Sequence, residues 1–297
     1  MKKEKIYKEI IKEALDLHVH VGPEVLPRKY TAATLTAAEK GKLGGACLKS
    51  HFFATTPFIK ELESVPKRFR LIGSIVLNQS VGGLNPEAVR ATASLSAGPI
   101  VVWFPTISAK KFLDQSEYEI RPEWVTGTNY RPRKSSEVKG IRITKGSRLT
   151  AEAVEVLQTI KKVGAVLATG HVSWQESRIL VAAAREIGIK SMIVTHPIYQ
   201  LIEMPVVVQR ELVLMGAFIE VCYSMYSIDG VPIGKIADQI KTVGVEYCIM
   251  SSDVGQVKSP NPSSALLDFM KQLEPEGFTQ DDFYRMLVTN PHRLIAR

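Results

Sequence analysis

The sequence predicts an α/β fold with parallel strands, and three observations support this prediction. Short apolar runs alternate with amphipathic helical stretches along the 297 residues of the chain. The apolar runs do not alternate with polar residues, which is typical of parallel strands that are buried on both faces. There are eight strand–helix units, and eight units in a chain of this length match a closed (β/α)8 barrel, or TIM barrel. We therefore predict one such barrel over residues 1–297.

The eight predicted strands are short apolar runs bounded by polar or glycine-containing turns. They cover residues 15–21, 45–49, 70–77, 100–104, 165–169, 191–195, 217–222 and 248–252. Helices are predicted at residues 34–42, from 56, from 85, and at 150–163, 175–187, 206–215 and 233–242, with more helices after the last strand. An open doubly wound sheet is the alternative fold. The glycine-rich phosphate turn of that fold is absent after the first strand, where the chain reads Val21-Gly-Pro-Glu-Val-Leu-Pro27.

Residues 107–145 do not fit the alternation of strands and helices. Their aromatic and charged composition, and their place after the fourth strand, predict an insertion between strands 4 and 5. Because the insertion leaves from the carboxyl end of a strand, we expect it to overhang the barrel mouth as a lid or a hairpin. A role in packing or oligomerisation fits the sequence equally well, and a homo-oligomer stays open.

The composition restricts the partners and the compartment. The net charge is +8, but the basic residues are spread over helical faces, and only residues 131–134 form a cluster. This distribution does not favour a nucleic-acid partner. The apolar runs are too short to span a bilayer, so no membrane partner is expected. Cys47, Cys222 and Cys248 each lie in an apolar run. They predict buried free thiols and a reducing, cytoplasmic location.

Five of the six histidines follow predicted strands at their carboxyl ends, where barrel active sites are built. His18 and His20 are separated by one residue on the first strand, so their side chains point the same way. His51 follows the second strand, His171 the fifth and His196 the sixth. We therefore expect these imidazoles to converge over the barrel mouth.

Three further polar residues occupy comparable positions. Asp253 follows the eighth strand, Lys49 ends the second strand, and Glu220 lies within the seventh strand, from which it could point into the barrel. Several imidazoles with a carboxylate form the ligand set of a hydrolytic metal site. A metal in such a site lowers the pKa of a bound water to about 7, and a neighbouring carboxylate can accept the proton of that water.

At these positions the chain resembles the amidohydrolase superfamily of metal-dependent hydrolases. The resemblance spans essentially the whole chain and includes the Thr289-Asn-Pro-His-Arg-Leu294 stretch near its end. It implies that the more buried metal is bound by His18, His20 and Asp253. It also implies that His171 and His196 bind a second metal or orient the substrate, and that Asp253 shuttles a proton from the nucleophilic water. Zinc is the first expectation, as one or two ions, and manganese, iron and nickel suit the same ligands.

The chain departs from the superfamily pattern after strand four. A bridging carboxylated lysine usually follows that strand, but this chain reads Trp103-Phe-Pro-Thr106 there. Lys49 lies after strand two instead, where it would serve as a cation for an anionic group or a developing oxyanion. His51 resembles a position in the polymerase-and-histidinol-phosphatase family of metal phosphoesterases, although the terminal Asp-x-His of that family is missing. Candidates for a second metal or for substrate binding are therefore Lys49, His51 and Glu220.

The predicted function is a metal-dependent hydrolase that cleaves an amide, lactone or other ester bond of a small anionic substrate. Asp253 and Lys49 are the predicted catalytic residues. One alternative is a phosphoesterase, for which Lys49 and residues 142–148 would supply cations. Another is a decarboxylase or isomerase with a single metal, which fits the missing bridging lysine. A barrel that binds without catalysis is disfavoured, because it has no need of five converging ligands.

Overall fold

The structure is a computed structural model that describes residues 2–62 and 69–296. All eight predicted strand runs contain parallel strands, and the third run is divided in two at Gly73. The parallel strands are β1 (Leu15–His20), β2 (Gly45–Lys49), β3 (Arg70–Ile72), β4 (Ser74–Val76), β5 (Val101–Trp103), β8 (Val166–Ala168), β9 (Met192–Val194), β10 (Ala217–Cys222) and β11 (Cys248–Ser251).

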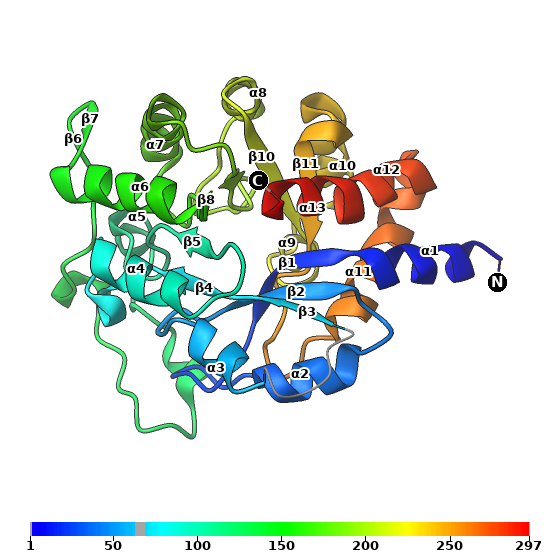
Figure 1. Cartoon of the computed structure of the whole chain (residues 1–297), viewed down its shortest axis with the longest axis horizontal. Helices are drawn as coiled ribbons and strands as arrows, with labels where there is room; N and C mark the ends of the chain where they lie inside the picture. Colours follow the sequence, from blue (N-terminus) through cyan, green and yellow to red (C-terminus); the bar gives the residue numbers. More distant parts are fainter. Residues whose placement is uncertain (1, 63–68, 297) are drawn as a thin grey trace.

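Helices follow the strands in the predicted alternation and lie around them (Figure 1). The first group comprises α1 (Lys2–Glu13), α2 (Ala32–Glu39), α3 (Thr56–Lys60), α4 (Pro86–Ser94), α6 (Ala151–Val163) and α7 (Trp174–Ile187). The second group comprises α8 (Val206–Leu214), α9 (Tyr223–Ser227), α10 (Ile233–Val243), α11 (Pro262–Leu273), α12 (Gln280–Tyr284) and α13 (Asn290–Ile295). The helix after β1 begins two residues earlier than predicted, because Thr31 and Thr34 form a capping box at its start.

The parallel strands form two sheets, in the orders β1-β2-β3 and β11-β10-β9-β8-β5-β4. The divided third run joins their ends, since β3 pairs with β2 and β4 pairs with β5. The α/β class with parallel sheets is therefore confirmed. The strands are arranged as these two sheets, and not as one continuous eight-stranded sheet.

Backbone hydrogen bonds also link β1 to the segment that follows β11. The amide of His20 donates to the carbonyl of Val254 at 2.8 Å, and the amide of Asp253 donates to the carbonyl of His18 at 2.9 Å. Val19 and Val254 form a parallel bridge. The first and last strands of the chain therefore lie side by side, which places residues 18–20 next to residue 253.

Two apolar layers pack against the strands. An inner cluster contains strand residues such as Leu17, Trp103 and Phe218, together with Leu294 and Ile295 of α13. Side chains from strands of both sheets therefore face one interior, and α13 covers one end of it. A second and larger cluster fills the space between the strands and the surrounding helices.

Local sequence signals explain where the helices begin and end. Ser173 and Glu176 form a capping box at the start of α7, and Gly188 ends that helix in the left-handed conformation. Thr150 caps α6 through the amide of Ala153, and Gly164 ends it in the same way as Gly188. Helices α6 and α7 are thus fixed by their own termini as well as by packing.

Residues 107–145 contain α5 (Lys110–Asp114), the 3-10 turns η2 (Pro122–Val125) and η3 (Ser135–Glu137), and strand β6 (Thr144–Lys145). Strand β6 pairs antiparallel with β7 (Arg148–Leu149), so the hairpin extends past the predicted boundary. Ile120 and Val125 pack with Leu26 and Phe52, which lie in the loops after β1 and β2. The segment therefore contacts loops at the carboxyl ends of the strands, and its action as a lid stays a prediction.

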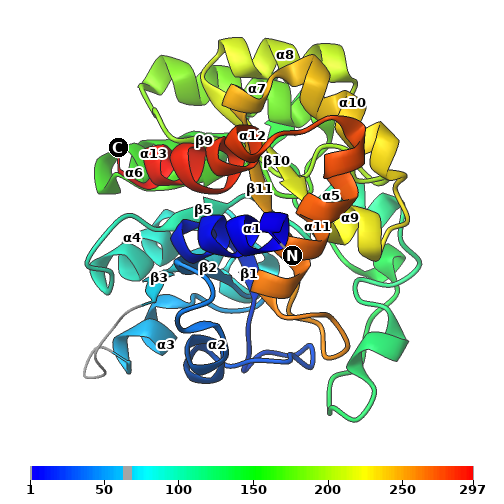
Figure 2. The ribbon, with the colours of Figure 1, turned by 90° about the vertical axis from the view of Figure 1, so that its right-hand side faces the viewer.

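Helix α1 lies beside the C-terminal helices α11 and α12, as Figure 2 shows. Helix α1 contacts α11 and α12, and the rings of Tyr7 and Phe283 meet edge to face with centroids 5.6 Å apart. Within residues 2–62 and 69–296, no helix has both the length and the apolar composition needed to cross a bilayer.

The reactivity of the three cysteines measures how readily this interior opens. Cys47, Cys222 and Cys248 are free and fully buried. Burial raises the pKa of each thiol, which suppresses the reactive thiolate. We expect no thiol of the native protein to react with Ellman's reagent within minutes. All three thiols should react in about 6 M guanidinium, which unfolds most domains. A fast native reaction of one thiol would show that its strand opens readily.

Candidate metal centre

A β-bulge in β1 directs the two histidines of that strand into the interior. Between Asp16 and Val19, three steps along β1 match two steps along β2. Leu17, before the end of this bulge, belongs to the inner apolar cluster, whereas Val19 belongs to the outer one. Because side chains alternate along a strand, the extra residue reverses which positions face inward. His18 and His20 therefore face the interior beside the end of β11.

The carboxylate of Asp253 lies between these two imidazoles. Its Oδ1 is 3.1 Å from Nε2 of His18 and 3.0 Å from Nε2 of His20. Ser224, in α9, donates a hydrogen bond to the other oxygen, Oδ2, at 2.6 Å. One ligand atom from each of His18, His20 and Asp253 lies within 4.8 Å of the others, and all three residues are buried. This spacing is compatible with one ion bound by all three.

A buried carboxylate beneath the cluster ties the bulge to the end of β11. Oδ1 of Asp16 accepts hydrogen bonds from the amide of His18 at 3.2 Å and from the amide of Ser252 at 3.0 Å. Burial raises the pKa of Asp16 to about 7. Asp16 therefore positions the backbone on both sides of the cluster.

His18 is held by two charged side chains on opposite edges of its ring. Both carboxylate oxygens of Glu220, in β10, are 3.2 Å from Nδ1 of His18. The ammonium nitrogen of Lys49, at the end of β2, is 2.8 Å from Nε2 and 5.1 Å from the centroid of the Trp103 ring. Lys49 is only 1% exposed, so its charge is screened very little by solvent. The Lys49 ammonium and the Asp253 carboxylate therefore both lie beside Nε2 of His18.

The pKa shifts in the cluster favour ionised carboxylates and a neutral His20. Burial would raise the pKa of Asp253 and of Glu220, but the neighbouring imidazoles, His18 first, outweigh burial and lower both values. For Asp253 the pKa falls well below its usual range. Burial, followed by the charge of Arg28, holds the pKa of His20 well below its usual range. Neutral imidazoles and ionised carboxylates are the forms that bind metals.

A second hydrogen-bonded chain approaches His20 from the opposite side. Nη2 of Arg28 is 3.2 Å from Nδ1 of His20, and the Arg28 guanidinium pairs with the carboxylate of Glu24 through Nε. Glu24 in turn accepts hydrogen bonds from the hydroxyl of Ser50 at 2.5 Å and from the amide of His51 at 2.8 Å. The loops after β1 and β2 therefore fix the guanidinium beside the imidazole.

Three more of the six histidines line the same cluster. The ring centroids of His171 and His196 are 5.0 Å apart, and that of His196 is 5.8 Å from His18. The His51 ring is 4.7 Å from His20, and its Nδ1 is 2.9 Å from the hydroxyl of Thr106. In the part of the chain that the structure describes, Nδ1 of His171 and Nδ1 of His196 are buried and have no hydrogen-bond partner. Burial lowers the pKa of His196 to about 4, so this ring is neutral near pH 7.

Every residue predicted for the site lies in this cluster or in ring contact with it. Those in direct polar contact are His18, His20, Lys49, Glu220 and Asp253, and those reached through ring contacts are His51, His171 and His196.

The sequence prediction missed Arg28 and Ser224. Arg28 lies in an irregular loop, where no periodicity indicates which side chain turns inward. Ser224 follows β10 by two residues, so the rule that site residues follow strands could have found it.

The donor set fits a divalent metal. Nε2 of His18 faces the ammonium of Lys49, which can only donate, so this nitrogen presents a lone pair. Asp253 presents a carboxylate oxygen at the same place. Within the described residues, Nδ1 of His171 and Nδ1 of His196 are buried without a hydrogen-bond partner, and these rings add possible metal ligands. Imidazole and carboxylate together suit zinc and the neighbouring transition metals.

A model of a family of unknown function, DUF6282, matches residues 13–220. The chain belongs to this family. The matched region includes all five histidines of the cluster and Glu220, and it ends before Asp253. No curated protein matches the sequence.

Solved structures match over nearly the whole chain at low sequence identity. An amidohydrolase from Pseudomonas aeruginosa matches with a TM-score of 0.60 and 10% identity, covering 97% of this chain and 98% of that one. An amidohydrolase from Burkholderia multivorans with bound HEPES matches with a TM-score of 0.54 and 12% identity, covering 95% and 99%. A TatD homologue from Escherichia coli K12 matches with a TM-score of 0.54 and 12% identity, covering 97% and 99%. The predicted resemblance to the amidohydrolase superfamily is thus confirmed at the level of the fold.

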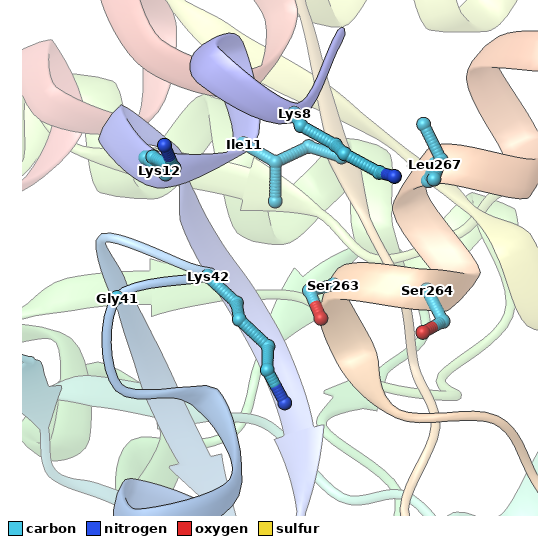
Figure 3. A pocket seen from close by; sticks show the side chains of 8 residues that line it. All are labelled: Lys8, Ile11, Lys12, Gly41, Lys42, Ser263, Ser264 and Leu267. Carbon is cyan, nitrogen blue, oxygen red and sulfur yellow. The ribbon is translucent and has the colours of Figure 1, made fainter. Parts of the chain in front are cut away.

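A separate pocket of about 200 Å³ lies on the outer surface between α1, the turn after α2, and α11 (Figure 3). Its lining includes Lys8, Lys12 and Lys42 and none of the predicted site residues. Lys8 is paired with Glu4 at 2.7 Å and Lys12 with Glu9 at 2.7 Å. The three ammonium groups point in different directions (Figure 3), so they do not form a converging anion site.

The substitution Gly170→Ala tests whether the backbone at Gly170 constrains the loop that carries His171. The φ of Gly170 is +66°, and a Cβ at this residue would lie 2.2 Å from the carbonyl oxygen of Phe104. We expect Gly170→Ala to lower the free energy of unfolding by at least about 3 kcal/mol, because a left-handed residue with a Cβ costs about 1–2 kcal/mol before any clash. Urea unfolding followed by circular dichroism measures this change.

Gly164→Ala is the matched control for this prediction. Gly164 has a φ of +68°, and within the described residues nothing lies within 4 Å of the Cβ position. This variant should lose only the conformational part, about 1–2 kcal/mol. Equal losses in the two variants would show that the backbone contact at Gly170 does not constrain the loop carrying His171.

Proposed function

We propose that this protein is a metal-dependent hydrolase that cleaves an amide, lactone or other ester bond of a small anionic substrate. The observation that carries the proposal is the convergence of His18, His20 and Asp253, with one ligand atom from each within 4.8 Å of the others. The solved amidohydrolases with the same fold support it. So does the position of the cluster, since carboxyl ends of parallel strands are where barrel enzymes carry out chemistry.

We also propose that the two sheets are parts of one (β/α)8 barrel over residues 1–297, with residues 107–145 as a lid. The divided run of β3 and β4 joins the sheets on one side, and the hydrogen bonds between residues 18–20 and 253–254 join them on the other. The contact between Phe112 of α5 and His171, with ring centroids 5.6 Å apart, brings the insertion to the cluster.

One divalent ion, with zinc as the first candidate, would be held by His18, His20 and Asp253. When bound, such an ion lowers the pKa of a water and polarises the scissile carbonyl group. His171 and His196 are neutral donors on the adjacent strand ends, and they suit either the same ion or the substrate carbonyl. A second ion would need ligands such as His51, whose Nδ1 is already engaged with Thr106.

The side chains of the cluster have separate roles in proton transfer and in substrate binding. Asp253 is ionised and accepts a proton from the attacking water, then passes it to the leaving group. The hydroxyl of Ser224 occupies Oδ2 and leaves Oδ1 facing the two imidazoles. Lys49 supplies a buried positive charge that binds an anionic substrate group or the developing oxyanion. A phosphate ester would use the same cation, so phosphoesters belong in the substrate screen beside lactones, amides and carboxylates.

The metal content of the purified protein tests the proposal most directly. We expect about one zinc or similar ion per chain by elemental mass spectrometry, because the two groups of three converging ligands, His18-His20-Asp253 and His18-Glu220-Cys222, share His18. His18→Ala should lose this ion, since it removes a ligand and leaves Asp253 without one of its partners. His292→Ala is the control, because Nε2 of His292 lies 3.2 Å from the backbone carbonyl of Glu13, away from the cluster. Equal metal content in both variants would contradict the proposed site.

Catalysis depends on the carboxylate of Asp253. Once a substrate is found, we expect Asp253→Asn to lower kcat by about 10²–10⁴-fold, because the amide cannot accept the proton of the attacking water. Asp238→Asn on the exposed face of α10 is the control and should keep full activity. Steady-state kinetics at saturating zinc separate this effect from a loss of metal. Unchanged turnover in Asp253→Asn would exclude Asp253 as the proton acceptor.

A further inference from the structure

The two histidines of β1 have opposite hydrogen-bond environments at Nδ1. His18 presents this nitrogen to the carboxylate of Glu220, and His20 presents it to the guanidinium of Arg28. An ionised carboxylate only accepts hydrogen bonds, and a guanidinium only donates them. The two imidazoles must therefore carry their protons on different nitrogens when both are neutral.

For His18 the proton position suits metal binding, and Lys49 must withdraw from Nε2 before an ion can occupy that lone pair. The proton sits on Nδ1 and is donated to Glu220, whose two oxygens are both 3.2 Å away. Nε2 then holds a lone pair, which faces the ammonium of Lys49 at 2.8 Å. Metal-bound histidines generally donate their other N–H to a carboxylate or carbonyl in this way. Glu220 thus prepares His18 as a ligand.

For His20 the arrangement opposes metal binding through Nε2. Nδ1 accepts from Nη2 of Arg28 at 3.2 Å, so the ring proton sits on Nε2 and is donated to Oδ1 of Asp253 at 3.0 Å. A ligand nitrogen must present a lone pair instead. The guanidinium cannot turn away freely, because Glu24 holds it and Glu24 is itself bound by Ser50 and His51. The side chain of Arg28 is 5% exposed and that of Glu24 is 0% exposed.

We propose that Arg28 is a positioning residue that keeps the proton of His20 on Nε2 and thereby weakens metal binding at this ring. The part of this inference that concerns metal rests on the proposed function, whereas the proton position does not. An ion held at Nε2 of His20 would require the ring proton to be on Nδ1, the nitrogen that Nη2 of Arg28 contacts at 3.2 Å. Glu220 and Arg28 therefore act in opposite directions on two ligands of the same ion.

Nuclear magnetic resonance tests the proton positions in the metal-free, full-length protein. Two-bond ¹H–¹⁵N correlations of ¹⁵N-histidine-labelled protein distinguish a ring proton on Nδ1 from one on Nε2, and His18→Gln and His20→Gln assign the signals. We expect Nδ1–H for His18 and Nε2–H for His20. In Arg28→Met, Asp253 can still accept from Nε2, so we expect part of the His20 population to move to Nδ1–H, a change that a purely structural role for Arg28 would not produce.

Two variants control for indirect effects on the ring. Arg133→Met removes an arginine that pairs with Glu119 in the insertion, and it should leave both signals unchanged. Glu24→Gln weakens the anchor of Arg28 while keeping the arginine, and it should shift the His20 proton in the same direction. It replaces Arg28→Met as the test where that variant does not fold. A proton on Nδ1 of His20 in the unmodified protein, or no gain of Nδ1–H in a folded Arg28→Met, overturns the inference.

Zinc affinity, measured by competition with a chelating dye, tests the consequence. We expect Arg28→Met to bind Zn²⁺ about tenfold more tightly, the effect of one hydrogen bond that no longer has to be broken. Glu220→Gln should bind about 10–100-fold more weakly. Failure of the unmodified protein to bind Zn²⁺ would refute the proposed function and leave the resonance result standing. Zinc binding that Arg28→Met does not tighten would refute the role of Arg28 in metal binding.

Discussion

The candidate site depends on the contact between the first and the last parallel strands. Reciprocal backbone bonds join His18 and His20 to the turn after β11, and the carboxylate of Asp253 then lies between the two imidazoles. Gly255 permits this approach, because a Cβ there would lie 2.0 Å from the carbonyl oxygen of His20. A larger residue would separate the strands and with them the ligand atoms. The geometry of the cluster is thus set by the backbone before any side-chain rotamer is chosen.

The cluster places several charged side chains in the interior, and each of those named here lies beside a group of opposite charge. Burial lowers the pKa of Lys49, and the charges of Asp253 and Glu220 beside it oppose this shift. Arg28 is neutralised by Glu24 on one side of the cluster. Buried charges are tolerated only when they are paired and hydrogen-bonded. The site is therefore a balanced network, in which removing one member leaves another charge uncompensated.

The sequence predicts much of this arrangement, and the remainder depends on contacts between strands and loops. The spacing of His18 and His20 predicts that they project together, and the position of Asp253 after the last strand predicts that it meets them. The bulge in β1 was not predictable, because register is a property of the pairing with β2. The guanidinium of Arg28 also escaped prediction, since it is placed by a loop whose path has no periodicity. The strands could be found because each is a continuous apolar run.

The junction of β1 with β11 also bears on how the protein reaches its native state. His20 and Asp253 are 233 residues apart along the chain. Contacts between such distant residues carry a large loop-closure cost and form late, which slows folding. During synthesis, the histidine pair emerges from the ribosome long before its carboxylate partner. A nascent chain therefore exposes two imidazoles without the finished centre, and only completion of the last parallel strand brings the three ligands together.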